Sequence, residues 1–395
     1  MNPLFVSKIH PTRATRRSPR SGWMILALIF ILLSACAPAA PTTAVPASTS
    51  ISPTPTAVPF STATPPEPTP AEPVELVVMT HDSFAVTESL IREFEQTHNA
   101  RITFLKSGDT GSALNRAILT KESPQADVFY GVDNTFLSRA LDEGIFEPYD
   151  SPKLTQIPDQ FKLDASHRAL PVDYGDVCIN YDKTYFASKG LAVPQSLEDL
   201  TRPEYHGLLV VENPATSSPG LAFLLATVAH FGEGTYLDYW ASLRNNGLVV
   251  VNDWETAYYT NFSASSGKGP QPMVVSYASS PAAEVIFAES PLSEAPTASI
   301  LAPDTCFRQI EFVGILKGTA KRALAEQFVD FMLDVPFQED IPLQMFVYPV
   351  NSQAKLPEEF LKYAQVPEKP ASLDPALIAS KREEWLKAWN ETVLR

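Results

Sequence analysis

The chain of 395 residues is 45% hydrophobic and 19% charged, and its 30 basic and 45 acidic residues give a formal net charge of −15. These values are ordinary for a globular protein, so they exclude disorder along the whole chain and a polytopic membrane protein, and they predict two domains or one large two-lobed domain. A protein that follows a nucleic-acid backbone needs clustered Lys and Arg, so the acidic balance argues against that class.

The chain opens with basic residues and a short apolar run from Trp23 to Leu33. As a helix this run would span only about 16 Å, well short of the roughly 30 Å hydrocarbon core of a bilayer. The pattern is typical of an export signal.

The sequence Leu33-Ser-Ala-Cys36 resembles a bacterial lipobox, in which the Cys becomes the lipidated first residue of the mature protein. We therefore expect residues 1–35 to be a signal peptide and Cys36 to anchor the protein to the outer face of the cell membrane; a signal for soluble secretion is the alternative.

A tract rich in Ala, Pro, Ser and Thr follows, from Ala37 to about Pro73. It has no apolar period and cannot bury a core. We expect residues 36–73 to form a disordered stalk behind the lipidated Cys36. A Pro-rich chain extends about 3.1 Å per residue, so the stalk would hold a domain up to ~100 Å from the bilayer.

Strands and helices alternate in the next segment. The apolar patterns predict strands at 75–80, 101–105 and 126–130, and helices at 88–97, 112–121 and 135–143. Such alternation indicates a parallel α/β sheet. Ligands of these sheets bind at the carboxyl ends of the strands, so residues 80–84, 108–110 and 131–134 are expected on one face.

A second α/β unit is predicted from about Tyr174 onward. Strands are expected at 177–181, 208–212, 248–252, 273–277 and 307–316, and helices at 219–231, 234–243, 319–333 and 375–394. Two such units on a stalk outside the cell suggest a binding protein whose two lobes close around a ligand.

The polar segments after these strands carry a resemblance. They are, in chain order, Asp82–Phe84, Asp109–Arg116, Ala126–Asn134, Asp173–Gly175, Asn213–Gly220, Asp253–Tyr258, Val275–Pro281 and Tyr348–Val350. Together they resemble the thiamine-binding proteins of bacterial ABC importers over nearly all of residues 75–395, and related ferric-iron and polyamine binders share parts of the pattern. The resemblance implies an α/β, two-lobed periplasmic-binding-protein type II fold, each lobe a mostly parallel sheet flanked by helices, with hinge crossovers. Lobe 1 would comprise residues 74–173 and about 308–395, and lobe 2 about 174–307.

The resemblance also implies a ligand site between the lobes. Asp109 and Thr110 match a contact loop on the first lobe, Trp254 matches an aromatic wall, and Ser217 and Ser218 match a polar loop near the hydroxyethyl or phosphate end of the ligand. A second contact loop is matched by Tyr277, Ala278, Ser279 and Ser280. Two positions depart from the family: Phe346 stands where we expect a Trp, and His81 stands where a Tyr is common.

The chemistry of thiamine fits these residue types. Its cationic thiazolium gains about 0.5–2 kcal/mol over an aromatic face, and stacking of its flat aminopyrimidine adds about 0.5–1.5 kcal/mol. The aromatic faces would come from Trp254, Tyr277, Phe346 and Tyr174, and the charge from Asp109 or Asp82.

Plain structural roles remain open at several of these positions. Trp254, Tyr277 and Phe346 could instead be core residues. Ser217 could simply cap the following helix, and Asp109 could be a turn residue.

The two cysteines that remain after Cys36 are Cys178 and Cys306, at strand positions near the predicted crossovers. Export would place them in an oxidising compartment, so we predict a disulfide between them; two buried free thiols are the alternative.

No metal spacing of the Cys/His kind and no nucleotide-binding loop appears in the sequence. The adjacent Tyr258 and Tyr259 invite comparison with iron-binding relatives. We expect no metal, no cofactor and no catalytic residue, a monomer, and a membrane permease as partner. The rival classes are a ferric-iron or polyamine binder on the same fold and an anchored thiamine-processing enzyme, which would need a cleft nucleophile such as Cys.

Overall fold

The computed structural model describes residues 72–264 and 268–395. The predicted signal peptide, Cys36 and the stalk up to residue 71 lie outside the described residues. Within the described part, no helix combines the length and the apolar character needed to cross a membrane.

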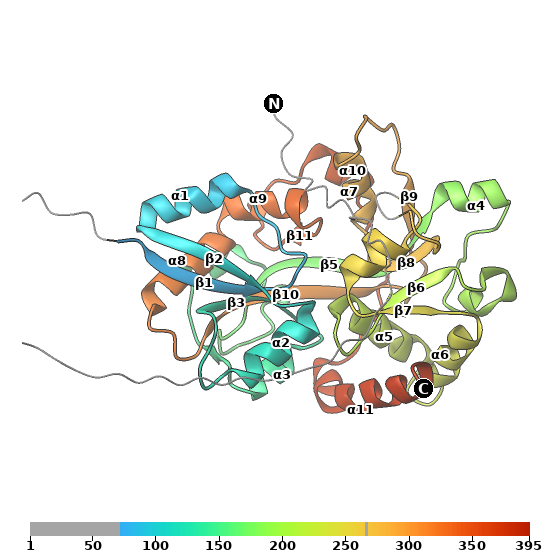
Figure 1. Ribbon diagram of the computed structural model, residues 1–395, viewed down its shortest axis with the longest axis horizontal. Coiled ribbons are helices and arrows are strands. Elements are labelled where there is room, and N and C mark those ends of the chain that lie inside the picture. The colour runs from blue at the N-terminus through green and yellow to red at the C-terminus, as the bar shows by residue number, and fades with distance from the viewer. Residues whose placement is uncertain (1–71, 265–267) are drawn as a thin grey trace, which may run out of the picture. The chain divides into compact units, whose positions relative to one another are not determined.

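The folded body is built on one mixed sheet (Figure 1) with the strand order β2-β1-β3-β10-β5-β8-β6-β7. Three further strands pair outside this order, β4 with β10, and β9 and β11 with β5. The strands are β1 Val74–Thr80, β2 Ala100–Lys106, β3 Val128–Asp133, β4 Phe146–Glu147, β5 Leu170–Asp182, β6 Leu209–Glu212, β7 Val249–Val251, β8 Met273–Tyr277, β9 Thr297–Ile300, β10 Phe307–Leu316 and β11 Tyr348–Pro349.

Helices cover both faces of this sheet. The α-helices are α1 Glu88–His98, α2 Thr110–Leu119, α3 Leu137–Asp142, α4 Lys183–Lys189, α5 Ser218–Phe231, α6 Tyr236–Asn245, α7 Ser280–Ile286, α8 Arg322–Leu333, α9 Val335–Gln344, α10 Glu358–Tyr363 and α11 Pro375–Val393. Short 3-10 turns lie at Pro152–Gln156, Asp159–Phe161, Glu198–Thr201 and Pro203–Tyr205, and a π-helical turn lies at Thr256–Asn261.

The first half of the sheet consists of β2, β1 and β3, which are parallel. Figure 1 shows α1 and α9 on one side of it and α2 and α3 on the other. Helix α1 buries Ile91 and Phe94, which are three residues apart and so share one helical face. Phe94 packs edge-on against Phe328 of α8 at 5.4 Å, which fixes α1 and α8 on the same side of the sheet.

The second half consists of β8, β6 and β7, also parallel to one another. Helix α11 packs against this half through Trp389, whose ring lies 5.5 Å from that of Trp240 on α6. The same helix reaches the first half, because the guanidinium of Arg382 donates to the carbonyl oxygen of Thr135 at 3.2 Å. Helix α11 therefore contacts both halves.

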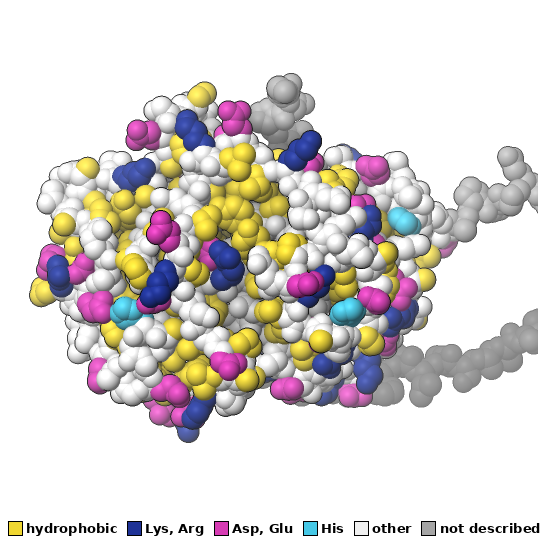
Figure 2. Space-filling model, turned by 180° about the vertical axis from the view of Figure 1, so that it is seen from behind, with side chains coloured by type: hydrophobic (Ala, Val, Ile, Leu, Met, Phe, Trp, Pro, Cys, Tyr) yellow, Lys and Arg dark blue, Asp and Glu magenta, His cyan; other side chains and the backbone are white. Residues whose placement is uncertain are grey.

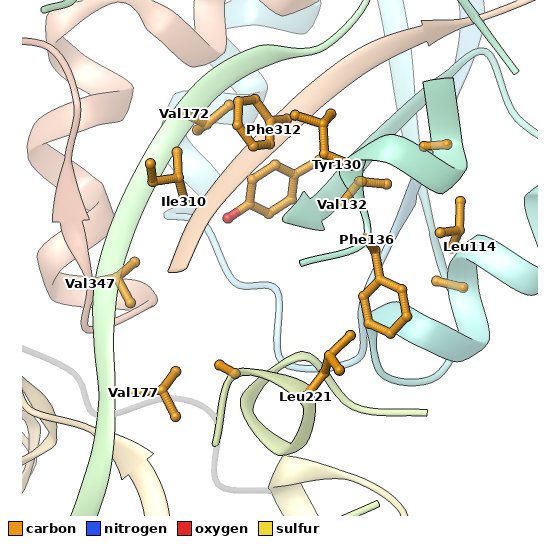
Figure 3. Packing of buried hydrophobic residues seen from close by; sticks show 14 of the residues in the cluster. Leu114, Tyr130, Val132, Phe136, Val172, Val177, Leu221, Ile310, Phe312 and Val347 are labelled. Carbon is orange, nitrogen blue, oxygen red and sulfur yellow. The ribbon is translucent and has the colours of Figure 1, made fainter. Parts of the chain in front are cut away.

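Two long antiparallel strands, β5 and β10, run through the middle of the sheet and join the halves. The lobe boundary predicted at residue 174 falls inside β5, and the one predicted near residue 308 falls at the start of β10. Figure 3 shows that the core is continuous across these strands, with Val172 and Val177 of β5 and Ile310 and Phe312 of β10 all buried. We call β5 and β10 the central strands.

A disulfide joins Cys178 of β5 to Cys306, which directly precedes β10, with a Cα–Cα distance of 4.3 Å. This is the pairing expected from the sequence. Both cysteines are fully buried and pack against Ala278 and Leu301. The bridge therefore ties the two central strands together next to one of the predicted contact loops.

Charges of both signs are mixed on the surface seen in Figure 2. Hydrophobic side chains gather over the middle of this face, and Lys, Arg, Asp and Glu are scattered around them. This face presents no continuous basic patch of the kind that tracks nucleic-acid phosphates.

Candidate functional site

Loops at the carboxyl ends of the strands from the two halves meet in the structure. The backbone N–H of Trp254 donates to Asp109 Oδ2 at 3.2 Å, and that of Ser112 donates to the carbonyl oxygen of Thr216 at 3.4 Å. A third contact joins the Ser218 hydroxyl to the carboxylate of Asp133. We call this meeting place the junction: residues 80–84, 108–112 and 131–135 of the first half and residues 213–218, 253–254 and 276–280 of the second half.

Asp109 and Thr110 lie at the start of α2, where Asp109 is the N-cap residue. Its Oδ1 accepts from the backbone N–H of Thr110 at 2.7 Å, and the Thr110 hydroxyl donates to the carbonyl oxygen of Gly131 at 3.0 Å. Burial raises the pKa of Asp109, and the nearby Ser217 hydroxyl and the backbone hydrogen bonds from Thr110 and Trp254 partly oppose that rise. Asp109 thus caps its own helix and also contacts the opposite half.

Ser217 and Ser218 begin α5, with Ser217 at the N-cap position and both side chains buried. The Ser218 hydroxyl donates to Asp133, whose pKa burial raises to about 7. The polar loop predicted near the hydroxyethyl or phosphate end of the ligand therefore lies against carboxyl groups of the first half.

Trp254 stands at the centre of an aromatic group. Its ring stacks on Tyr258 at 5.0 Å with an interplanar angle of 19°, and meets Tyr259 and Tyr277 edge-on at 5.4 and 6.5 Å. Its indole N–H donates to the Ser276 hydroxyl at 3.0 Å, which fixes the ring orientation. Trp254 and Tyr277 are only partly buried. One face of Trp254 is thus covered by Tyr258, the ring orientation is fixed by the hydrogen bond at its edge, and the residue keeps partial exposure.

Phe346 is a non-glycine residue in the left-handed region, with φ 59°. Its carbonyl oxygen accepts from the Ser279 hydroxyl at 2.5 Å, and its ring meets that of the exposed Phe287 at 5.1 Å. Strained backbone of this kind persists only where the surroundings hold it, and it clusters at functional sites. The structure thus brings Ser279 and Phe346, two of the predicted site residues, into direct contact.

One predicted site residue, Tyr174, is engaged outside the junction. Tyr174 stacks on Phe161 at 4.7 Å and on Tyr348 at 5.2 Å. Since neighbouring strand residues point to opposite faces, Tyr174 lies on the face of β5 opposite to Asp173, away from Trp254. The structure does not bring Tyr174 together with the aromatic group at the junction.

Asp82 and Ala278 serve the local backbone. Asp82 Oδ1 accepts from the backbone N–H of Gly108 at 2.9 Å and so ties two junction loops of the first half together. Ala278 is buried against the disulfide, and its N–H donates to the carbonyl oxygen of Asp176 at 2.8 Å.

The structure adds a buried group that the predicted site omits: Tyr130, Asp173 and Glu311, which we call the acidic cluster. The Tyr130 hydroxyl lies 2.6 Å from Asp173 Oδ2 and 2.9 Å from Glu311 Oε2. Burial, and then the proximity of Glu311, raises the pKa of Asp173 well above its usual range, and burial raises that of Glu311 to about 7. His81 Nε2 lies 3.8 Å from Glu311 Oε2. Burial lowers the pKa of His81, so the imidazole favours its neutral form.

One signal in the sequence could have revealed this cluster. Glu311 is an acidic residue in the middle of an apolar strand, and Glu is almost never fully buried unless it is paired. Its partner Asp173 lies in a segment that the resemblance already marks, but the pairing joins strands 138 residues apart in the sequence.

Within the described residues, no group of three or more His, Cys, Asp or Glu side chains is arranged to hold a metal ion. In the adjacent tyrosine pair, the hydroxyl of Tyr258 donates to Glu284, and its ring is stacked under Trp254. The pair thus forms part of the aromatic group.

Comparison with known proteins gives consistent results. Residues 123–368 match the family model described as bacterial extracellular solute-binding protein. The thiamine-binding periplasmic protein of Brucella suis is 29% identical over 321 residues, which cover 80% of this chain and 90% of that protein. The protein of the same name from Escherichia coli is 28% identical over 330 residues, 82% and 95% of the two chains. A solved periplasmic thiamin binding protein superposes with a TM-score of 0.71 at 27% identity, covering 81% of this chain and 96% of that one.

Proposed function

Because this chain belongs to the family of bacterial extracellular solute-binding proteins, we propose that it captures thiamine, or a thiamine phosphate ester, at the junction and delivers it to the permease of an ABC importer. The chain is the binding component of a transporter and not an enzyme. It has the two-lobed type II fold that the sequence predicts.

The observation that carries the proposal for thiamine is the meeting of an aromatic group and carboxyl groups across the junction. Trp254 and Tyr277 come from the second half, and Asp109, from the first half, accepts a hydrogen bond from the backbone of Trp254 itself. An aromatic face beside a carboxylate favours a flat organic cation, because both attract positive charge. Closure around the ligand follows if the ligand contacts both halves and so favours the closed state.

Isothermal titration with thiamine, thiamine monophosphate and thiamine diphosphate tests the ligand. Binding of at least one of the three with a dissociation constant below about 10 μM, or roughly −7 kcal/mol, is expected. Fe³⁺ and spermidine serve as comparison ligands. Tight binding of either, with no thiamine compound bound, would replace the proposal by the iron or polyamine alternative.

The same titration should depend on pH. Glu311 and Asp133 each have a pKa of about 7 in the free protein. A bound cation favours the ionised carboxylate, so affinity should rise by about tenfold from pH 6 to pH 8 for one such group. His81 acts in the same direction, because its protonation at low pH would repel the cation. The charged groups around His81 are Glu311, Asp82, Lys106, Asp109, Asp173 and Glu255.

The thermal stability of the ligand-free protein provides the control for this pH dependence, since its sign is opposite. The folded pKa values lie above the ordinary values of these acids, so their contribution to stability is present at low pH and is lost as the pH rises through 7. An affinity that falls between pH 6 and pH 8 would contradict the placement of the cation near these carboxyl groups.

We also propose that residues 1–35 are removed and that Cys36 carries the lipid that anchors the protein to the outer face of the membrane. The support is the lipobox-like sequence Leu33-Ser-Ala-Cys36 and the extracellular character of the family. The mature chain should begin at a diacylated Cys36 in intact-mass measurements. An unmodified N-terminus at another residue would reject the anchor.

A further inference from the structure

The acidic cluster is connected to the aromatic group through Gln309 of β10. The Gln309 side-chain amide donates to the Tyr277 hydroxyl at 3.0 Å and to Glu311 Oε1 at 3.3 Å. Tyr277 in turn lies edge-on to Trp254 at 6.5 Å. A continuous group of side chains therefore runs from the stacking face of Trp254 to the carboxyl groups between the central strands.

Hydrogen-bonding capacity in this group is not fully used by the described residues. The oxygen Oε1 of Gln309 is buried and has no hydrogen-bond partner among them, although the residue is only 1% exposed. The same holds for Nε2 of His81, a residue that is 7% exposed. Its nearest carboxylate atom, Glu311 Oε2 at 3.8 Å, is beyond hydrogen-bonding distance. Buried polar atoms without partners are costly, so a ligand group that hydrogen-bonds to these two atoms would remove that cost.

The number of protons available in the acidic cluster indicates which kind of ligand group can bind beside it. The Tyr130 hydroxyl has one proton but lies within 2.9 Å of oxygens from both Asp173 and Glu311. Only one of these contacts can use that proton, so the second requires a proton on one of the two carboxyl groups. The acidic cluster then holds one negative charge and offers acceptor oxygens, with Gln309 Oε1 beside them. Such a place suits N–H donors on a ligand that carries positive charge.

We propose that Glu311, Gln309 and His81 bind the amino-substituted edge of the ligand's heteroaromatic ring, and that this subsite distinguishes an amino group from an oxo group at that edge. The inference rests on the proposed function, because it takes thiamine as the ligand. The exocyclic amino group of the pyrimidine donates to the oxygens of Glu311 and Gln309. A ring nitrogen beside it pairs with His81 Nε2. An oxo group in place of the amino group presents an oxygen to these acceptors and leaves them unpaired.

Oxythiamine is the matched probe, because it retains the cationic thiazolium and replaces only the 4-amino group of the pyrimidine by oxygen. Titration of the full-length chain with both compounds should give an affinity for thiamine at least ~10-fold higher, since a site built to accept from a donor rejects the analogue that lacks it. Equal affinity for the two compounds would overturn the inference and leave the proposed function standing. Failure of both compounds and of the thiamine phosphates to bind would reject the proposed function itself.

The Glu311→Gln variant locates the discrimination. It replaces one acceptor oxygen by a donor amide of nearly the same shape, so the thiamine-to-oxythiamine ratio should fall toward one. A purely structural role for Glu311 would instead lower both affinities by the same factor, and that result would overturn the assignment. Glu358→Gln, at an exposed position of α10, is the matched control and should keep the wild-type ratio. The wild-type ratio alone still decides the inference if Glu311→Gln fails to fold.

Discussion

Replacing Trp254 with Ala is expected to weaken thiamine binding about 100-fold. The ring stacks on Tyr258 with one face and is fixed by the hydrogen bond from its indole N–H to Ser276, so its other face is preorganised for a flat cation. Loss of one stacking and one cation–π contact removes about 2–3 kcal/mol, and each 1.4 kcal/mol is a factor of ten in affinity. Isothermal titration of the variant measures the change directly.

Trp254→Phe is the matched control for this prediction. It keeps an aromatic face but loses the indole N–H, so its affinity should fall between those of the wild type and Trp254→Ala. Unfolding curves of both variants separate a binding defect from a loss of folded protein. If Trp254→Ala binds thiamine as tightly as the wild type does, Trp254 serves only in packing. That is the alternative role that the sequence allows.

Removal of the disulfide should have the largest effect on stability. The double variant Cys178→Ala/Cys306→Ala opens a bridge between residues 128 apart in sequence. Constraint of the unfolded chain over a loop of about this length stabilises a protein by roughly 3–5 kcal/mol, so the free energy of unfolding should fall by about that amount. Urea denaturation under non-reducing conditions provides the measurement.

Cys36→Ser is the control, because it removes a cysteine and leaves the bridge intact. Its free energy of unfolding should match that of the wild type. A loss below about 1 kcal/mol in the double variant would show that the two central strands are held in register by their packing and backbone hydrogen bonds alone.

The fold class was predictable because the pattern that encodes it is local. Alternating strands and helices between residues 75 and 143 indicate a parallel sheet, and β1, β2 and β3 are indeed parallel neighbours. The segments after the strands are polar for a shared reason: they end at one edge of the sheet. The junction therefore assembles residues such as Asp109, Ser218 and Trp254 from both halves.

The bounds and the pairing of the central strands are harder to predict from the sequence. The sequence predicts a strand only from Val177, whereas β5 begins at Leu170 and continues through Asp173 and Tyr174. Polar residues in a strand weaken the apolar signal, and their burial here depends on partners from β3 and β10 that lie far away in the sequence. The antiparallel pairing of β10 with both β3 and β5 is likewise a property of the assembled sheet.

Dependence on partners far away in the sequence also explains why the predicted and observed roles of Tyr174 and Asp173 differ. The sequence pattern places Tyr174 among the ligand residues because its segment belongs to the resemblance, but strand alternation turns its ring toward Phe161 and Tyr348. Asp173, one position earlier, faces Tyr130 and Glu311. A pattern of segments identifies which loops and strands matter, and the direction of each side chain is fixed only when neighbouring strands are in place.

The shared central strands also determine how the molecule melts. Strand β5 contributes Val172 next to Ile310 and Phe312 in the part of the core that contains Tyr130, and Val177 further along toward Leu221 (Figure 3). Loss of the strands of one half would expose core residues of the other half. We therefore expect the two halves to unfold as a single cooperative unit, without a stable intermediate that keeps one half intact.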